Sequence, residues 1–186
     1  MIKCLIFDLD GTLLFTKEAN FISYKQAFKD LNIKIEKDKY DKAFGLRVDE
    51  MVKIVAPGTT KEEIKKIRKR KAHYYQKNVK LIKPNKALIN FLKYVKPNYK
   101  VALATTASKI NAEYLLDHFE IKDIFDVIVY GEDVVQGKPN PECYEVCIKR
   151  CEVEPQECLI FEDSEVGVQA VLRANANVIR MPKNES

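Results

Sequence analysis

The chain has 186 residues, of which 46% are hydrophobic and 32% charged, and its formal net charge is +5, an ordinary composition for a soluble globular protein. Its length fits one domain, or one domain with an insertion. No apolar run reaches the roughly 18 residues that cross a membrane, and an acidic residue already stands at position 8, inside what would be the apolar core of a secretory signal. We therefore expect a cytoplasmic protein that does not bind a membrane.

The first predicted strand is the apolar run at residues 2–7, and two acidic residues follow it. Asp8 and Asp10 lie in the stretch FDLDGTLL, and side chains two residues apart in an extended segment point to the same side. Their carboxylates would therefore crowd each other. The arrangement requires a further group, outside the two carboxylates, that makes this crowding tolerable.

A long helical interval separates the first strand from the second. Residues 15–80 contain three segments with helical periodicity, divided by the turn sequence APGTT. Thr60, followed three residues later by Glu63, has the pattern of a capping box. Because the interval is too long for one crossover connection, we predict a helical cap subdomain at 15–80, inserted into a core formed by 1–14 and 81–186.

Much of the positive charge lies in residues 61–80 of this interval. A nucleic-acid surface is one interpretation of such a run. However, Glu62 and Glu63 interrupt it, and an apolar stripe with helical spacing, broken only at Lys71, is typical of an amphipathic helix with a solvated face. We expect no nucleic-acid partner, although the same field would favour a small anionic substrate.

Four more apolar runs of strand length follow in the second half of the chain. They are residues 100–104, 126–130, 158–161 and 177–181, and helix-period segments at 109–119, 141–151 and 165–174 separate them. Continuous apolar strands indicate burial on both faces, and alternation of strands with helices is typical of α/β proteins. We predict a Rossmann-like α/β fold with a doubly wound, parallel sheet of five strands.

Five cysteines in a chain without a secretory signal indicate reduced thiols rather than disulfides. Cys143, Cys147 and Cys151 recur at a four-residue spacing, which places them on one face of a helix. A metal site is one interpretation, but no CxxC pair occurs, and cysteine is also a common small buried hydrophobe. We favour packing in the core over metal binding.

Polar side chains follow four of the predicted strands, at the edge of the sheet where doubly wound proteins place their active sites. These side chains are Asp8 and Asp10, Thr105 and Thr106, Lys138, and Glu162 and Asp163. A hard divalent cation would neutralise acids that gather in this way, and Mg²⁺ prefers a few carboxylates together with phosphate oxygens. The lysine would add a positive charge for the phosphate itself.

Four stretches of the chain, in this order, resemble the four motifs of the haloacid-dehalogenase-like hydrolase superfamily. They are FDLDGTLL, ALATTAS, GKPNPECY and FEDSEVGVQA, and with the helical interval they cover nearly the whole chain. A cap placed after the first strand resembles the subgroup of phosphoglycolate phosphatases and β-phosphoglucomutases. The resemblance therefore implies the fold predicted above and a role for each residue at the strand ends.

The resemblance implies catalytic and phosphate-binding roles for the first three motifs. Asp8 is expected to be the nucleophile that forms an aspartyl-phosphate. Asp10 is expected to protonate the leaving oxygen and then to activate water. Thr105, with Thr106 beside it, and Lys138 are expected to bind the phosphate.

The same resemblance implies a Mg²⁺ site. Asp8 and the backbone carbonyl of Asp10 are expected to bind the ion, together with the acidic pair Glu162 and Asp163 of the fourth motif. Asp163 is the expected direct ligand of that pair. Superfamily members that cleave carbon–halogen or carbon–phosphorus bonds generally lack an aspartate at the position of Asp10, so its presence favours phosphoryl transfer from oxygen.

We therefore expect a monomeric, Mg²⁺-dependent phosphatase that acts on a small phosphorylated metabolite. One alternative is a sugar-phosphate mutase of the β-phosphoglucomutase type, although those enzymes present a histidine in the first cap helix where this chain has Asn20. A phospho-accepting signalling module is a further alternative. Such modules place the phosphorylated aspartate after the third strand, whereas here the Asp-x-Asp pair follows the first.

Residues of the cap are expected to select the substrate. Arg47 lies where related caps present polar groups, and its guanidinium suits a carboxylate or a second phosphate. Asn20 is a second candidate, and Lys80 and Lys83 are weaker ones. The segment that returns from the cap departs from the family pattern, because Asn85 follows Pro84 where relatives usually have glycine.

Overall fold

A computed structural model describes residues 1–182 of the chain, which forms two compact units. One unit consists of Met1–Phe15 and Pro84–Ser186, and the other of Thr16–Lys83. We call them the core unit and the cap unit. A two-stranded sheet, made of β2 (Leu14–Phe15) and β3 (Lys83–Pro84), forms where the chain passes from one unit to the other.

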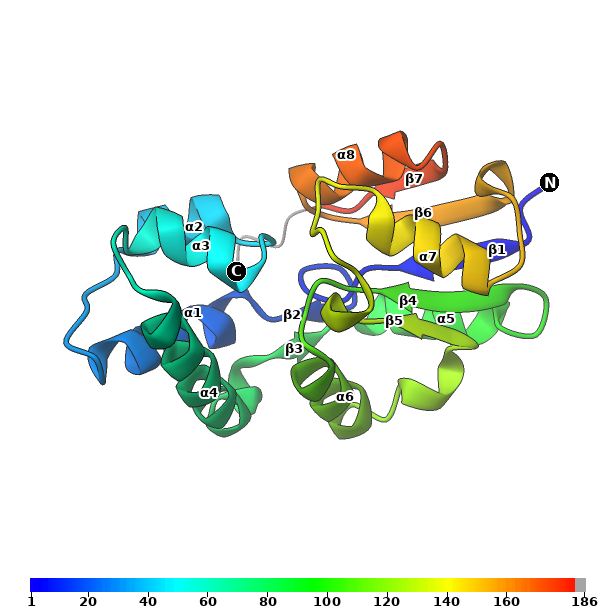
Figure 1. The fold of residues 1–186 in the computed structure, drawn as a ribbon. Helices are drawn as coiled ribbons and strands as arrows, with labels where there is room; N and C mark the ends of the chain where they lie inside the picture. The colour runs from blue at the N-terminus through cyan, green and yellow to red at the C-terminus, as the bar shows by residue number, and fades with distance from the viewer. Residues whose placement is uncertain (183–186) are drawn as a thin grey trace. The chain divides into compact units, whose positions relative to one another are not determined.

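The core unit is built on a five-stranded sheet with the strand order β5-β4-β1-β6-β7 (Figure 1). The strands are β1 (Cys4–Phe7), β4 (Lys100–Ala104), β5 (Val127–Val129), β6 (Cys158–Glu162) and β7 (Asn177–Arg180). Every pair of neighbours is parallel. The predicted five-stranded parallel sheet is therefore confirmed, with β1 at its centre.

Helices cover both faces of this sheet. They are α5 (Lys86–Val95), α6 (Lys109–His118), α7 (Glu142–Arg150) and α8 (Glu165–Arg173). Crossovers between parallel strands are right-handed, and the strand order reverses direction after β5. The helices α5 and α6 therefore lie on one face, and α7 and α8 lie on the other (Figure 1). Short 3₁₀ turns, η2 (Lys122–Ile124), η3 (Gly131–Asp133) and η4 (Pro155–Glu157), complete the connections.

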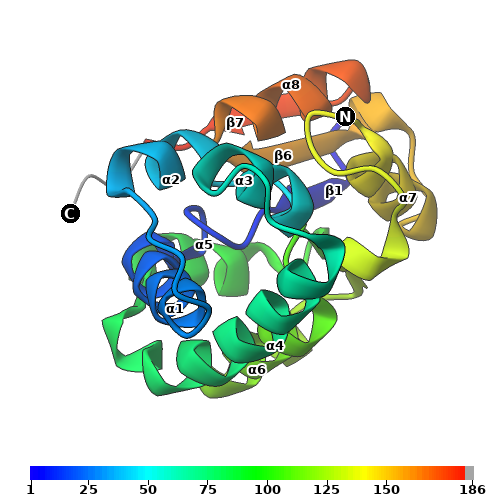
Figure 2. The same cartoon turned by 60° about the vertical axis from the view of Figure 1, so that its left-hand side comes forward.

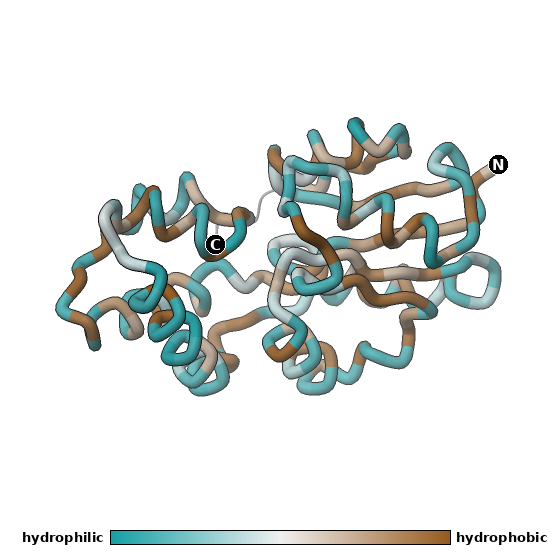
Figure 3. The backbone as a smooth tube through the Cα atoms, in the orientation of Figure 1, coloured by the Kyte–Doolittle hydropathy of each residue, from teal (hydrophilic) through white to brown (hydrophobic). Residues whose placement is uncertain are grey.

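The three central strands, β1, β4 and β6, are buried because nearly all of their side chains are apolar, whereas β7 at the edge of the sheet is largely exposed. All four residues of β1 are buried, and apolar segments gather along the strands in Figure 3. On one face of the sheet, the ring of Phe161 stacks on Phe7 at 4.6 Å between centroids, and Phe91 of α5 contacts it at 5.8 Å. The other face carries Cys4, Ile6 and Ile160, which pack against α7 and α8.

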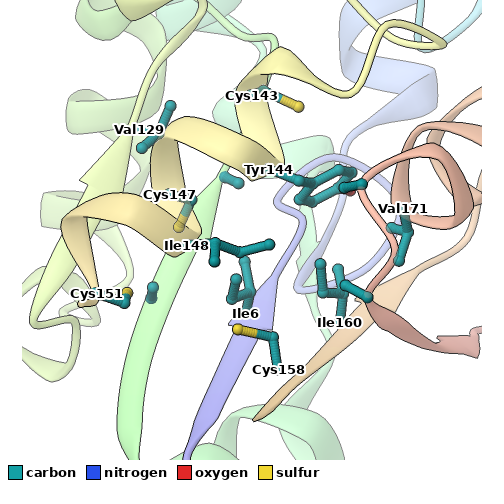
Figure 4. Packing of buried hydrophobic residues seen from close by; sticks show 14 of the residues in the cluster. Ile6, Val129, Cys143, Tyr144, Cys147, Ile148, Cys151, Cys158, Ile160 and Val171 are labelled. Carbon is teal, nitrogen blue, oxygen red and sulfur yellow. The ribbon is translucent and has the colours of Figure 1, made fainter. Parts of the chain in front are cut away.

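The cysteines belong to that second face. Cys143 and Cys147 lie on the side of α7 that faces the sheet, Cys151 follows directly after the helix, and Cys158 lies on β6 (Figure 4). These four thiols and that of Cys4 are buried and free of disulfides. Among residues 1–182, no group of three or more side chains that could hold a metal includes a cysteine. The cysteines therefore act as small core residues, as the sequence indicated.

The cap unit is helical and has a hydrophobic core of its own. Its helices are α1 (Lys17–Lys29), α2 (Lys37–Ala43), α3 (Val48–Val55) and α4 (Lys61–Lys77), followed by the turn η1 (Val79–Leu81). Helices α1 and α4 pack against each other (Figure 2), and the buried side chains include Phe28, Tyr40 and Ile67. The sequence indicated three helical segments here, and the short helix α3 is the one that it did not distinguish.

The predicted capping box at the start of α4 is confirmed. The amide of Glu63 donates to the hydroxyl of Thr60, and the amide of Thr60 donates to the Glu63 carboxylate at 2.8 Å. No helix within residues 1–182 combines the length and the apolar composition needed to span a membrane.

Asn85 occupies the position where relatives usually have glycine, and its hydrogen bonds give it a structural role there. Its side-chain oxygen accepts a hydrogen bond from the amide of Leu88 and so caps α5. Its side-chain nitrogen donates to the carbonyl of Thr12 at 3.1 Å, and its backbone amide donates to Leu13. One side chain therefore joins the start of α5 to the loop that follows β1.

We predict that Asn85→Ala lowers the free energy of unfolding by about 1–2 kcal/mol, because it removes both the helix cap and the bond to Thr12. The matched variant Asn85→Ser keeps an acceptor for the amide of Leu88 and should recover part of that loss. Urea denaturation of the three proteins measures the difference. Equal losses in the two variants would show that the cap contributes nothing.

Candidate active site

The first motif begins where β1 ends, and the sheet itself holds Asp8 in place. The backbone amide of Asp8 donates to the carbonyl of Phe161 at 3.0 Å, so the pairing between β1 and β6 continues one residue past Phe7. The Asp8 side chain is 7% exposed. After it the chain turns sharply at Gly11, which has a φ of 100° and donates its amide to the carbonyl of Leu14. The turn keeps Asp8 at the carboxyl edge of the sheet.

Lys138 reaches this edge from the loop between β5 and α7. Its ammonium nitrogen lies 2.6 Å from Oδ1 of Asp8 and 2.7 Å from Oε2 of Glu162. All three side chains are buried, and Lys138 is 3% exposed. The structure therefore brings the expected nucleophile, the expected phosphate-binding lysine and one of the acidic pair into direct contact, although they come from three separate segments.

Glu162 is the most heavily hydrogen-bonded of these groups. Its Oε2 accepts from Lys138 and from the phenol of Tyr144, and its Oε1 accepts from both the amide and the hydroxyl of Ser164. These four bonds use the lone pairs that a carboxylate offers. Gly167 of α8 makes room for the group, because a Cβ at that position would lie 2.0 Å from the Glu162 carboxyl carbon.

Asp163 has fewer partners than Glu162. The hydroxyl of Thr12 donates to its Oδ1 at 3.1 Å. Gly11 lies against the same carboxylate, since a Cβ on that residue would come within 2.3 Å of Oδ2. Burial, followed by the negative charge of Glu162, raises the pKa of Asp163 to about 6. Asp163 is therefore a buried carboxylate whose charge the protein leaves incompletely neutralised.

The electrostatics of the other groups follow from burial and from the single ammonium group. Burial, and then the charge of Glu162, raise the pKa of Asp8 well above its usual range, against the opposing charge of Lys138. Burial acts in the same direction on Glu162, but the charge and hydrogen bond of Lys138 outweigh it and keep the pKa of Glu162 below its ordinary value. Burial disfavours the charged form of Lys138, yet Asp8 and Glu162 outweigh it and raise the pKa of Lys138.

The acidic groups are spaced as a metal site requires. One oxygen each from Asp8, Glu162 and Asp163 lies within 4.8 Å of the others. An all-oxygen set of carboxylates is the donor chemistry that Mg²⁺ prefers, so these residues fit the ion. The side chain of Asp10 is not part of this group of three, and its residue is only half-buried, where the backbone forms a bridge with Leu14.

The second motif supplies a hydroxyl at the end of β4. The amide of Thr105 donates to the carbonyl of Val129, which continues the pairing with β5. Its side-chain oxygen accepts from the amide of Ala107 at 3.0 Å, an arrangement that leaves the hydroxyl hydrogen to donate elsewhere. Thr106 is half-buried, and its carbonyl lies against Gly131, where a Cβ would come within 2.5 Å.

The proposed substrate residues of the cap unit lie on different elements. Asn20 of α1 is buried, and its side-chain nitrogen lies 3.4 Å from the hydroxyl of Tyr75 on α4. Arg47 is half-buried and precedes α3, where its carbonyl accepts from the amides of the first turn. Lys80 and Lys83 are exposed.

Lys71, which seemed to break the apolar stripe of α4, is a buried cation. Its ammonium lies 3.6 Å from the ring centroid of Tyr75 and 5.3 Å from that of Tyr24. Aromatic faces attract a positive charge, so the residue stays within the helix's buried face. The sequence did not indicate that Lys71 is buried, because a helical pattern judged by residue type alone assigns a lysine to the solvent-exposed face.

We predict that Gly167→Ala destabilises the protein, although the same change inside an ordinary helix stabilises it by up to about 1 kcal/mol. The new Cβ would overlap the Glu162 carboxylate, which four hydrogen bonds hold in place, and we expect a loss of about 2 kcal/mol. The matched variant Gln169→Ala, at an exposed position of the same helix, should change little. Thermal melting of both variants measures this, and equal stability of the two would contradict the packing described.

Comparison with known proteins agrees with this geometry. The family model described as haloacid dehalogenase-like hydrolase matches residues 5–181. The phosphorylated carbohydrates phosphatase of Thermotoga maritima is 30% identical over 175 residues, which cover 92% of this chain and 81% of the relative. The beta-phosphoglucomutase of Bacillus subtilis is 27% identical over 92% of this chain and 80% of its own length.

Solved structures show the same relationship. CbbY from Rhodobacter sphaeroides, in complex with phosphate, has a TM-score of 0.86 and 25% identity, and the match covers 98% of this chain and 87% of CbbY. Beta-phosphoglucomutase from Clostridium difficile has a TM-score of 0.83 and 26% identity, with 97% and 84% covered. Since the family model spans nearly the whole chain, this protein is an enzyme of the haloacid dehalogenase-like hydrolase family.

Proposed function

We propose that this enzyme is a Mg²⁺-dependent phosphatase that hydrolyses a small phosphorylated metabolite through an aspartyl-phosphate on Asp8. The observation that supports the proposal most strongly is the contact of the buried Lys138 ammonium with Asp8, at 2.6 Å, beside two further buried carboxylates. A nucleophile and a fixed positive charge at this distance suit a phosphoryl group, whose negative oxygens need both positioning and neutralisation.

In the proposed reaction, an oxygen of Asp8 attacks phosphorus while the bond from phosphorus to the ester oxygen breaks. Asp10 donates a proton to the departing oxygen and then accepts one from the water that attacks the aspartyl-phosphate. That water releases inorganic phosphate and restores Asp8. Lys138 places its charge on the phosphoryl oxygens, and the Thr105 hydroxyl has a hydrogen available to donate to one of them.

We propose Asp8, Asp163 and the backbone carbonyl of Asp10 as the residues that hold Mg²⁺, with Glu162 as the third carboxylate beside them. Glu162 already accepts four hydrogen bonds. Lys138 is the charged donor among them, so the lysine rather than the ion is the main partner of Glu162. When bound, the ion would supply positive charge that offsets the acidic residues and the phosphoryl oxygens.

The cap unit is the proposed source of substrate selectivity. We propose Arg47 and Asn20 as substrate-contacting residues, because a guanidinium and an amide suit the hydroxyl, carboxylate or phosphate groups of a small metabolite. Relatives named for phosphorylated carbohydrates and for fructose 1-phosphate suggest sugar phosphates as the first compounds to test. We also propose that the enzyme works as a monomer in the cytoplasm, where its five buried thiols would stay reduced.

A sugar-phosphate mutase remains the second candidate, since beta-phosphoglucomutases match nearly the whole chain in both sequence and structure. Asn20 weighs against it. An amide cannot exchange a proton as a histidine can, and here the amide lies against the Tyr75 hydroxyl.

The test is a screen of phosphorylated sugars and other small phosphomonoesters for release of phosphate, with Mg²⁺ and with a chelator. We expect Mg²⁺-dependent release by the wild type and a loss of more than about a thousandfold in Asp8→Asn, because an amide is a poor nucleophile. Asp117→Asn, which changes an exposed carboxylate on α6, is the matched control and should keep full activity.

Two outcomes of the screen would contradict this proposal. Isomerisation of a sugar phosphate without net release of phosphate would favour the mutase. A folded wild type that turned over no phosphomonoester in the presence of Mg²⁺ would exclude the phosphatase.

A further inference from the structure

Tyr144 is buried next to the proposed phosphate site, although none of the roles considered so far involves it. It lies in the first turn of α7 and is fully buried. Its phenol oxygen lies 2.5 Å from Oε2 of Glu162, and the Lys138 ammonium lies 4.8 Å from the centroid of its ring. We propose that Tyr144 is a positioning residue that orients Glu162 and, through it, holds Lys138 where the phosphoryl group binds. This inference rests on the proposed phosphatase function.

The hydrogen bonds of Glu162 show why a second donor matters. Oε1 is held by the amide and hydroxyl of Ser164, whereas Oε2 is held by Lys138 and Tyr144. Without the phenol, only the bond from Lys138 would remain of these two bonds to Oε2. Lys138 is shared between Asp8 and Glu162, so it does not fix Oε2 by itself. The phenol, fixed by its own helix, supplies the anchor instead.

The phenol also limits how strongly Glu162 attracts Lys138. The ammonium is shared between Asp8 at 2.6 Å and Glu162 at 2.7 Å. A carboxylate oxygen that accepts a hydrogen bond from a neutral donor has less negative charge left for the ammonium. Tyr144 therefore keeps Glu162 from drawing Lys138 away from Asp8, where the phosphoryl group would be transferred.

The surroundings of Tyr144 suit a rigid donor. Its ring belongs to the core cluster that contains Ile6, Ile160 and Val171, and it lies between α7 and α8 over the sheet (Figure 4). A phenol is protonated at neutral pH, so the Tyr144 hydroxyl donates to Oε2 of Glu162. Phenylalanine would fill the same space, so Tyr144→Phe removes the hydroxyl and leaves the packing intact.

The experiment compares the wild type with Tyr144→Phe, using a phosphomonoester that the wild type hydrolyses, at a temperature where melting curves show each protein to be folded. We expect kcat to fall roughly tenfold or more, because a hydrogen bond to a charged group is lost, while KM changes much less. Inorganic phosphate should also become a weaker inhibitor of the variant. Tyr130→Phe is the matched control, since its hydroxyl contacts Glu113 away from Lys138, and it should behave as the wild type.

A double-mutant cycle with Lys138→Ala, at enzyme concentrations high enough to measure slow turnover, tests whether Tyr144 acts through the lysine. If it does, adding Tyr144→Phe to Lys138→Ala should cause little further loss. A full additional loss would overturn the proposal, as would wild-type values of kcat and phosphate inhibition in Tyr144→Phe. A wild type that hydrolyses nothing would overturn the proposed function together with this inference, whereas an active wild type with an equally active Tyr144→Phe would overturn this inference alone.

Discussion

One buried ammonium group stands between two buried carboxylates at the carboxyl edge of the sheet, and much of the surrounding structure depends on it. Lys138 contacts both Asp8 and Glu162. Removing an ion from water costs several kcal/mol unless it is paired and hydrogen-bonded. The three buried charges are therefore stable only if the ends of β1 and β6 and the loop before α7 are positioned so that the ammonium contacts both carboxylates. The strand order achieves this, because it places β1 directly beside β6.

The charges of this cluster do not balance within the protein. Asp163 adds a third buried carboxylate, and the neutral hydroxyl of Thr12 donates to it. Burial, and then the negative charge of Glu162, raise the pKa values of both Asp8 and Asp163. An arrangement that is unfavourable for the protein alone is well suited to a divalent cation, and a protein that neutralised it fully would have no affinity left for one. The two glycines that face these carboxylates, Gly11 and Gly167, let the backbone approach closely enough to keep them in position.

Local patterns in the sequence predicted most of the fold. The five strands and the capping box of Thr60 and Glu63 are encoded by hydrophobic runs and by residues three apart, which a single sequence displays directly. The motifs at the strand ends also indicated that Asp8, Lys138, Glu162 and Asp163 would lie close together, because parallel strands end at one edge of the sheet. Asn85, which seemed to be a departure from the family pattern, is the cap of α5.

The partners within the site could not be predicted in the same way. The bond from Tyr144 to Glu162 joins residues 18 apart, and the bond from Lys138 to Asp8 joins residues 130 apart. Such contacts depend on how helices dock on the sheet, which periodicity does not specify. Lys71 shows the same limit, because the spacing within α4 does not reveal the rings of Tyr24 and Tyr75 that lie near its ammonium.

The central claim is that the carboxylates beside Lys138 form a site for a divalent cation. Calorimetric titration of Mg²⁺ into the wild type, Asp163→Asn and Asp117→Asn tests it most directly, because it needs no substrate. The account predicts one ion per chain for the wild type and for Asp117→Asn, and an affinity at least about tenfold weaker for Asp163→Asn. Equal Mg²⁺ affinity in all three proteins, or no binding to the folded wild type, would contradict it.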